Sequence, residues 1–91
     1  MRVWQYALNP VKGTDLMLPR GAEIFHVGEQ HGTPYLWALV ETKSPTEKRV
    51  FYAALTGEEV PEHFRYIGTF QIESMPFIGR FVGHVFEKRG A

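Results

Sequence analysis

The sequence contains four histidines, the side chains best suited to hold a metal ion or move a proton near neutral pH. They are His26, His31, His63 and His84. A zinc site needs three or four converging ligands, often with two of them at a short spacing such as His-x-x-x-His. No pair of these histidines has that spacing. His26 and His84 could meet across neighbouring strands with Glu23 or Glu87 nearby. Turns, loops and half-buried sheet positions are, however, the ordinary places for such residues. We therefore predict no metal site.

The last histidine lies in the stretch RFVGHVFEK, residues 80–88, which alternates like a β-strand. The alternation puts His84 on one face with Val82 and Phe86. A histidine between two apolar neighbours is normally satisfied by hydrogen bonds within the sheet. We therefore predict that His84 is a hydrogen-bonded sheet residue and not a ligand.

Nucleophilic and acid-base catalysis would need a nucleophile, a base and a group that orients the base. Ser44 and Ser74 both lie in stretches that contain proline, and neither belongs to a G-x-S-x-G elbow. Glu58 and Glu59 are adjacent and with Glu62 form an acidic loop, which is typical of a solvated surface. The glycines are scattered and form no phosphate-binding loop. The sequence therefore predicts no enzyme and no cofactor.

Aromatic and basic residues come from several parts of the chain. The aromatic residues that different expected strands contribute are Trp4, Tyr6, Tyr35, Trp37, Tyr52 and Tyr66, and the arginines that begin or flank strands are Arg49, Arg65 and Arg80. Small barrels bind single-stranded nucleic acid by stacking bases on such rings inside a basic groove, and arginine forks can hold the phosphates of a nucleotide. Most rings in a chain of this size belong to the core. Those that remain exposed are more typical of a protein interface.

Size and composition narrow the possibilities further. The chain has 91 residues, which predicts a single domain, 1–91, and 44% of them are hydrophobic. Ten basic and ten acidic residues cancel, whereas a protein that binds nucleic acid through phosphates usually has a basic excess. The absence of cysteine excludes disulfides and thiolate sites. No apolar run approaches the roughly 20 residues of a membrane span, and the first ten residues do not resemble a signal peptide. We expect a cytoplasmic protein.

Short runs rich in β-branched and aromatic residues, separated by glycine and proline, predict six or seven antiparallel strands. The expected strands cover residues 3–8, 15–19, 22–30, 33–41, 47–56, 64–72 and 80–88. His31-Gly32 reads as a two-residue hairpin turn in which the glycine takes a positive φ. The run 47–56 is expected to pair back on 33–41, the stretch 73–79 to join the last two strands, and one helical turn could form near 58–64. The predicted fold is an all-β meander curled into a sheet, barrel or sandwich.

Two of these strands are apolar on both faces, which a solvated outer face would not be. In the run 33–41, Tyr35 and Trp37 alternate with Leu36 and Ala38, and the run 47–56 behaves likewise. The second face therefore needs a cover, which could be another element, a ligand or a second copy of the chain. A homodimer is the simplest cover, because small β-proteins often hide such faces by symmetric association. Gly83 similarly needs a close neighbour, for which the rings of Phe70 and Tyr66 are candidates.

Several motifs of the sequence together resemble a family of small uncharacterised proteins found in bacteriophage and prophage genomes. The motifs are MRVWQY, GAEIFHV, HGTPYLWALVE, TEKRVF, YIGTFQ and FVGHVFE. The resemblance extends over most of the chain apart from residues 9–17 and 57–63. It implies a phage-encoded or prophage-encoded accessory protein that acts in the bacterial cytoplasm, and it carries over no catalytic residue.

We expect a binding protein that inhibits a host protein or an anti-phage defence component by steric docking. The expected contact residues are Tyr35, Trp37, Arg49 and Tyr52 on central strands, with Glu58, Glu59 and Glu62 as a second patch. Two alternatives stay open at this point. One is a dimeric barrel that sequesters a small nucleotide-like ligand, and the other is a small barrel that binds single-stranded nucleic acid.

Overall fold

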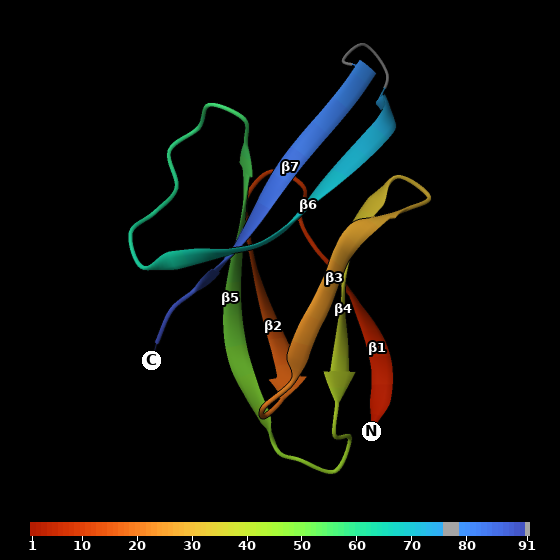
Figure 1. The fold of residues 1–91 in the computed structure, drawn as a ribbon, viewed down its shortest axis with the longest axis vertical. Coiled ribbons are helices and arrows are strands. Elements are labelled where there is room, and N and C mark those ends of the chain that lie inside the picture. Colours follow the sequence, from red (N-terminus) through yellow and green to blue (C-terminus); the bar gives the residue numbers. More distant parts are fainter. Residues whose placement is uncertain (76–78, 91) are drawn as a thin grey trace.

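The computed structural model describes residues 1–75 and 79–90, which form seven β-strands (Figure 1). The strands are β1 (Arg2–Ala7), β2 (Gly13–Pro19), β3 (Glu23–Gln30), β4 (Thr33–Val40), β5 (Thr46–Leu55), β6 (Phe64–Met75) and β7 (Gly79–Lys88). The predicted all-β class and number of strands are confirmed. This part of the chain contains no helix, and so none that could cross a membrane.

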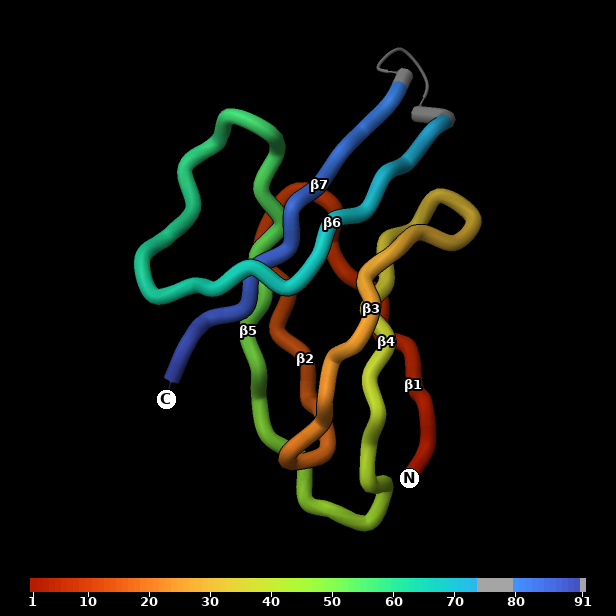
Figure 2. The backbone as a smooth tube through the Cα atoms, viewed as in Figure 1, coloured from red at the N-terminus to blue at the C-terminus, as the bar shows by residue number. Residues whose placement is uncertain are grey.

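The strands form two antiparallel sheets that pack on each other without closing into a barrel. Sheet A has the order β1-β4-β3, and sheet B has the order β2-β5-β7-β6. Figure 2 shows the chain passing back and forth between the two sheets, with β6 and β7 of sheet B extending past the other strands. The architecture is that of a small, open sandwich.

The strand order corrects the expected meander, because β5 does not pair with β4. It lies in the other sheet, between β2 and β7. The loop before β5 is tied to the end of β2 by a hydrogen bond from the Arg20 amide to the Pro45 carbonyl, 2.8 Å long. This contact directs β5 towards β2. Its buried residues Phe51 and Ala53 belong to the same hydrophobic core as Leu36 of β4, so the two strands share the core without pairing.

The expected hairpin turn joins β3 to β4 and is confirmed. Gln30 pairs with Thr33, and only His31 and Gly32 lie between them, with φ of 54° and 83°. Two positive φ values match the right-handed twist of the flanking strands. The Glu29 carboxylate accepts a hydrogen bond of 2.7 Å from the Gly32 amide, which holds the turn.

The helical turn that the sequence allowed near 58–64 does not form. Gly57 and His63 have positive φ values of 94° and 68°, outside the right-handed helical region. Pro61 also pushes the residue before it towards extended geometry. Glu58 instead closes a turn on Leu55, donating its amide to the Leu55 carbonyl and accepting the Leu55 amide on its carboxylate. The segment therefore crosses from β5 to β6 as an irregular loop. The predicted connection 73–79 lies partly outside the described residues, and Glu73–Met75 and Gly79 belong to strands.

One core lies between the sheets and takes residues from both. Its fully buried side chains include Leu18, Leu36, Val40, Phe51, Phe70 and Val85. On the β3–β6 side the sheets approach so closely that a Cβ at Gly68 would stand 2.6 Å from the Cβ of Val27. Gly68 is therefore the position that lets β6 lie against β3.

Tyr6 on β1 points inward beside Leu36, and its hydroxyl is buried without a hydrogen-bond partner among the described residues. Because a desolvated O–H without a partner costs about 1–3 kcal/mol, we expect Tyr6→Phe to raise the free energy of unfolding by about 1 kcal/mol. Burial also raises the pKa of Tyr6 above 10.0. Above pH 10 the unfolded chain loses this proton while the folded chain keeps it, so the wild type loses stability there until the folded pKa is passed.

Urea denaturation of both proteins at neutral and alkaline pH checks this prediction. The stability gain from Tyr6→Phe should be larger above pH 10 than at neutral pH, because phenylalanine cannot ionise. Tyr35→Phe is the matched control. It also removes a tyrosine hydroxyl, but Tyr6 has the one that is buried without a hydrogen-bond partner among the described residues. Equal stability of Tyr6→Phe and the wild type at every pH would contradict the prediction.

Candidate functional site

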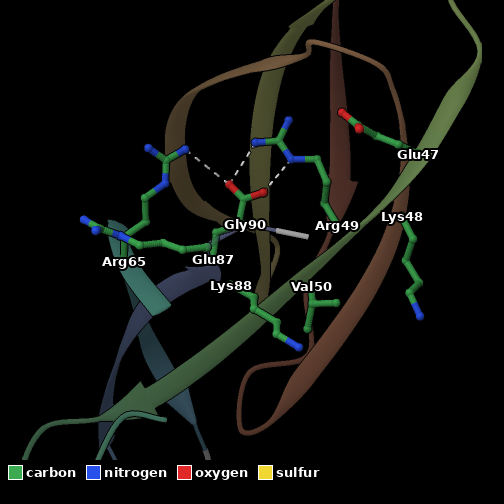
Figure 3. A pocket seen from close by; sticks show the side chains of 9 residues that line it. Glu47, Lys48, Arg49, Val50, Arg65, Glu87, Lys88 and Gly90 are labelled. Carbon is green, nitrogen blue, oxygen red and sulfur yellow. Dashed lines mark hydrogen bonds and ion pairs between the residues drawn. The ribbon is translucent and has the colours of Figure 1, made fainter. Parts of the chain in front are cut away.

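A groove of about 790 Å³ opens at the end of sheet B where two strands separate (Figure 3). Its lining residues are Glu47, Lys48, Arg49, Val50, Arg65, Glu87, Lys88, Arg89 and Gly90. The volume lies within the range of roughly 300–1,000 Å³ that is usual for ligand sites. The residues come from β5, β6, β7 and the segment that follows β7.

The pairing of the strands explains why the groove forms here. β5 pairs with β7 only from Phe51 to Leu55, so its first half, which includes Lys48, has a neighbour only on the β2 side. β7 stays with β6 up to the Phe64–Lys88 pair. Beyond β7, the Arg89 amide donates a hydrogen bond of 2.5 Å to the His63 carbonyl, which draws the chain away from β5. The space between the diverging strands is the groove.

A bidentate ion pair between Arg49 and Glu87 forms the floor of this groove (Figure 3). Nε and Nη2 of Arg49 donate to the two carboxylate oxygens of Glu87 at 2.5 and 2.8 Å, and Nη1 donates to the Ala22 carbonyl at 2.6 Å. The side chains are 15% and 8% exposed. The hydrogen bonds that Arg49 donates to Glu87 raise the pKa of Arg49, although burial acts in the opposite direction. The pair therefore joins β5 and β7 to the start of β3 and is structural.

The charge of the groove is strongly positive although the whole chain is neutral. Five of the ten basic residues line it, against two of the ten acidic ones, which gives the groove a charge of +3 and leaves the remainder of the chain at −3. Arg49 is neutralised by Glu87. The excess therefore rests on exposed side chains at the rim, such as Arg65 and Lys88.

An aromatic cluster lies on the outer face of sheet B beside the groove. The Tyr52 and Phe64 rings meet edge to face at 6.3 Å, and Tyr66 and Phe86 do so at 5.7 Å. Phe64 pairs with the groove residue Lys88 across the two strands, and Tyr66 is 58% exposed. The basic groove is thus bordered by rings of which one is largely open to solvent.

The prediction that His84 is hydrogen-bonded within the sheet is confirmed on this same face. Its Nε2 lies 2.8 Å from the Thr56 hydroxyl, and its Nδ1 lies 3.1 Å from the Thr69 hydroxyl, which also bonds the Tyr66 hydroxyl. Both ring nitrogens are therefore occupied by protein groups.

A second aromatic surface covers the outer face of sheet A. The Trp37 ring lies 5.8 Å from Tyr35 and 5.2 Å from His26. It also lies over Gly28, where a Cβ would be 3.5 Å from the Trp37 ring. The cross-strand partners on this face include Val3–Leu39 and Gln5–Trp37, and Glu23 is the acidic residue at its corner. The middle of the face carries no charge.

The whole length of the chain, residues 1–91, matches the family described as "Domain of unknown function (DUF7352)". The chain belongs to this family. Comparisons with curated proteins and with solved structures find no match, and the description of the family names no activity. The resemblance noted for the sequence motifs is thus confirmed as membership of an uncharacterised family.

In this DUF7352 chain the expected contact residues lie in four separate places. Tyr35 and Trp37 lie together on the outer face of sheet A, Tyr52 lies in the aromatic cluster of sheet B, and Arg49 lies in the groove floor. The acidic residues Glu58, Glu59 and Glu62 lie in the β5–β6 loop, where all three are exposed. His26 and His84 lie on opposite outer faces of the sandwich and cannot share a ligand.

The groove itself was missed by the sequence interpretation, which named Arg49 and Arg65 but not Lys48 or Lys88, and considered Glu87 only as a possible neighbour of the histidines. The sequence nevertheless contained an indication of the ion pair in the groove floor. Arg49 and Glu87 stand on the same alternation face as buried apolar residues such as Phe51 and Val85. Opposite charges on the apolar faces of two strands must pair with each other, because a single buried charge is costly. Among residues 1–75 and 79–90, no group of three or more potential ligands could hold a metal ion.

Proposed function

We propose that this chain is a non-enzymatic binding protein that docks on a protein partner through the outer face of sheet A and blocks it sterically. The observation that carries the proposal is an aromatic row on a face whose middle carries no charge, in which Tyr35 and Trp37 are half-buried and His26 is exposed. Tyrosine and tryptophan are enriched at interface centres, where charged residues are depleted. An uncharged face suits a protein partner better than a polyanion.

The edge of the same sheet supports this type of partner. β1 pairs with β4 on one side only, and its residues Val3 and Trp4 are 56% and 42% exposed. A free strand edge beside an aromatic face can receive a strand of another protein. The acidic loop, with the exposed Glu59 and Glu62, supplies a second contact for a basic surface of the partner.

The origin and the target are part of the same proposal. The phage-type motifs support a chain encoded by a phage or prophage and acting in the bacterial cytoplasm. Its partner is then a host protein or an anti-phage defence component, which the bound chain inhibits. A second copy of this chain is the competing occupant of the face, because a homodimer would hide the same residues.

Capture from a bacterial lysate, followed by binding to the purified partner, tests the proposal. Trp37→Ser should weaken the affinity for that partner by at least about 30-fold, the effect of an interface hot spot. Tyr66→Ser, which changes an exposed ring of sheet B, should retain it. Both variants need a melting temperature close to that of the wild type, and Tyr35→Ser replaces Trp37→Ser if the latter unfolds.

Two results would overturn the proposal. One is equal binding by Trp37→Ser and the wild type, which would place the interface elsewhere. The other is a wild-type dimer in analytical ultracentrifugation that Tyr35→Glu converts to monomer, since the face would then be covered by the second copy.

A further inference from the structure

The groove in sheet B offers cations that form only long ion pairs, or none, with the described part of the protein. Lys48 Nζ lies 4.0 Å from Asp15, and both side chains are at least 60% exposed. Arg65 lies 3.6 Å from a Glu87 oxygen that already accepts a hydrogen bond from Arg49. Within residues 1–75 and 79–90, Lys88 forms no ion pair within 4.0 Å, nor does Arg89. These four side chains can therefore turn towards a ligand at little cost.

The charged groups in the floor of the groove are already bonded to each other. Both carboxylate oxygens of Glu87 accept hydrogen bonds from Arg49, and the remaining nitrogen of Arg49 donates to the Ala22 carbonyl. Glu47, the other acidic residue of the lining, accepts a hydrogen bond of 3.4 Å from the Gly21 amide on its carboxylate. A fixed neutral floor under a rim of free cations is an arrangement that selects anions.

The border of the groove adds a surface for a flat ring. Lys88 on the rim is the cross-strand neighbour of Phe64, which contacts Tyr52. The next ring on the same face, Tyr66, is 58% exposed and is held by its hydroxyl through Thr69. An exposed, fixed aromatic ring next to a basic groove is the combination that binds a base and its phosphates together.

From these features we infer that the groove binds a small nucleotide with at least two phosphate charges. The phosphates lie between Arg65, Lys88 and Lys48, and the base stacks on Tyr66. Arginine forks and lysines form strong charge-assisted hydrogen bonds to phosphate oxygens. This site lies in sheet B and does not depend on the docking face of sheet A.

A compact ligand fits better than a nucleic-acid strand. Outside the groove the chain has a charge of −3, so a strand that left the groove would meet an acidic surface. The exposed residues Glu59 and Glu62 belong to the β5–β6 loop, to which the segment after β7 is bonded. A polyanion gains affinity with each phosphate that is neutralised, and a strand longer than the groove would pass beyond its five cations.

Isothermal titration calorimetry at low salt tests the inference with defined probes. The probes are ADP, GDP, cyclic di-AMP, cyclic di-GMP, adenosine, inorganic pyrophosphate and a single-stranded oligo-dT of about 20 nucleotides. At least one of the four nucleotides should bind with a Kd below about 100 µM. Arg65→Gln combined with Lys88→Gln should weaken this binding at least tenfold, because two charge-assisted hydrogen bonds are lost.

The matched control is Arg80→Gln combined with Lys12→Gln, which removes two exposed cations outside the groove and should leave the Kd unchanged. Tyr66→Leu should weaken the nucleotide about tenfold and leave any binding of pyrophosphate unchanged, since base stacking contributes about 1–3 kcal/mol. Adenosine alone should not bind.

Three outcomes would overturn the inference. The first is that no nucleotide binds below about 1 mM. The second is that only oligo-dT binds, with a steep loss of affinity as salt rises, which would make the groove a nucleic-acid site. The third is that pyrophosphate binds as tightly as every nucleotide and Tyr66→Leu changes nothing, which would leave a phosphate site without base recognition. None of these outcomes bears on the partner of sheet A, so the two proposals fail separately.

Discussion

Glu87→Gln should lower the free energy of unfolding by about 3 kcal/mol, because it leaves the buried Arg49 guanidinium without a counter-charge. Arg49 is 15% exposed and holds Glu87 with two hydrogen bonds and the Ala22 carbonyl with a third. Removing one partner of such a pair costs more than the pair contributes, since the remaining charge stays desolvated. In a domain of this size the loss corresponds to a fall of roughly 12–24 °C in Tm. Thermal and urea denaturation measure both quantities.

The double variant Arg49→Met with Glu87→Leu separates this cause from a general loss of packing. It removes both charges and fills the space with apolar side chains, so its stability should lie within about 1 kcal/mol of the wild type. Arg49→Met alone should be nearly as destabilised as Glu87→Gln. Glu59→Gln, in the exposed loop, is the control for the loss of one carboxylate and should have no measurable effect. If the double variant were destabilised by the sum of the two single effects, the pair would not be the cause.

The strands and the β3–β4 turn show how much of the fold the sequence determines. Alternation correctly predicted which residues of β4 and of β7 share a face, because successive side chains of a strand point to opposite sides. It did not reveal which of the two faces is buried. The turn at His31-Gly32 was also predicted correctly, since few two-residue turns match the twist of the flanking strands and these turns favour glycine. The sequence did not predict correctly which sheet contains β5. It depends on the contact between the loop before β5 and Arg20, which is distant in the sequence.

The candidate sites were readable to a similar extent. Tyr35 and Trp37 are two positions apart on one strand, so the sequence alone predicts that they lie on the same face. It does not establish that this face is the outer one. The groove did not follow from it, because a groove is the gap left where β5 and β7 diverge. Its cations, such as Lys48 and Lys88, come from strands whose relative register no local pattern reveals. Net neutrality also concealed the groove, since the acidic β5–β6 loop cancels it in any count over the whole chain.

The glycine in the middle of β7 is explained by the ring that covers it. Gly83 is the cross-strand partner of Phe70, whose ring lies directly over it and is 2% exposed. Of the two rings expected there, Phe70 is therefore the one that needs the space. The ring also stacks on Phe81, with centroids 6.1 Å apart and planes inclined by 18°. A glycine in the middle of a strand is normally unfavourable, and here the aromatic ring that covers it offsets the cost.

This packing predicts that Gly83→Ala destabilises the protein by about 3 kcal/mol, the upper part of the usual range for an overfilled core. The new Cβ would overlap the end of the Phe70 ring and stand 2.5 and 2.9 Å from two further ring atoms. The ring cannot move aside, because it is buried and stacked on Phe81. Urea denaturation measures the loss, and Gly13→Ala is the control. A Cβ at Gly13 would be 3.6 Å from the nearest atom, the Phe51 carbonyl oxygen, so that variant should change stability by less than about 1 kcal/mol.

A second substitution on the neighbouring strand tests whether the overlap is the cause. Phe70→Leu alone leaves a cavity over Gly83 and should also destabilise the protein. In the double variant Gly83→Ala with Phe70→Leu, the new methyl group occupies part of that cavity. The double variant should therefore be more stable than the sum of the single effects by over about 1 kcal/mol, as expected for residues in direct contact. Strict additivity would mean that Gly83 is required for a reason other than the ring of Phe70.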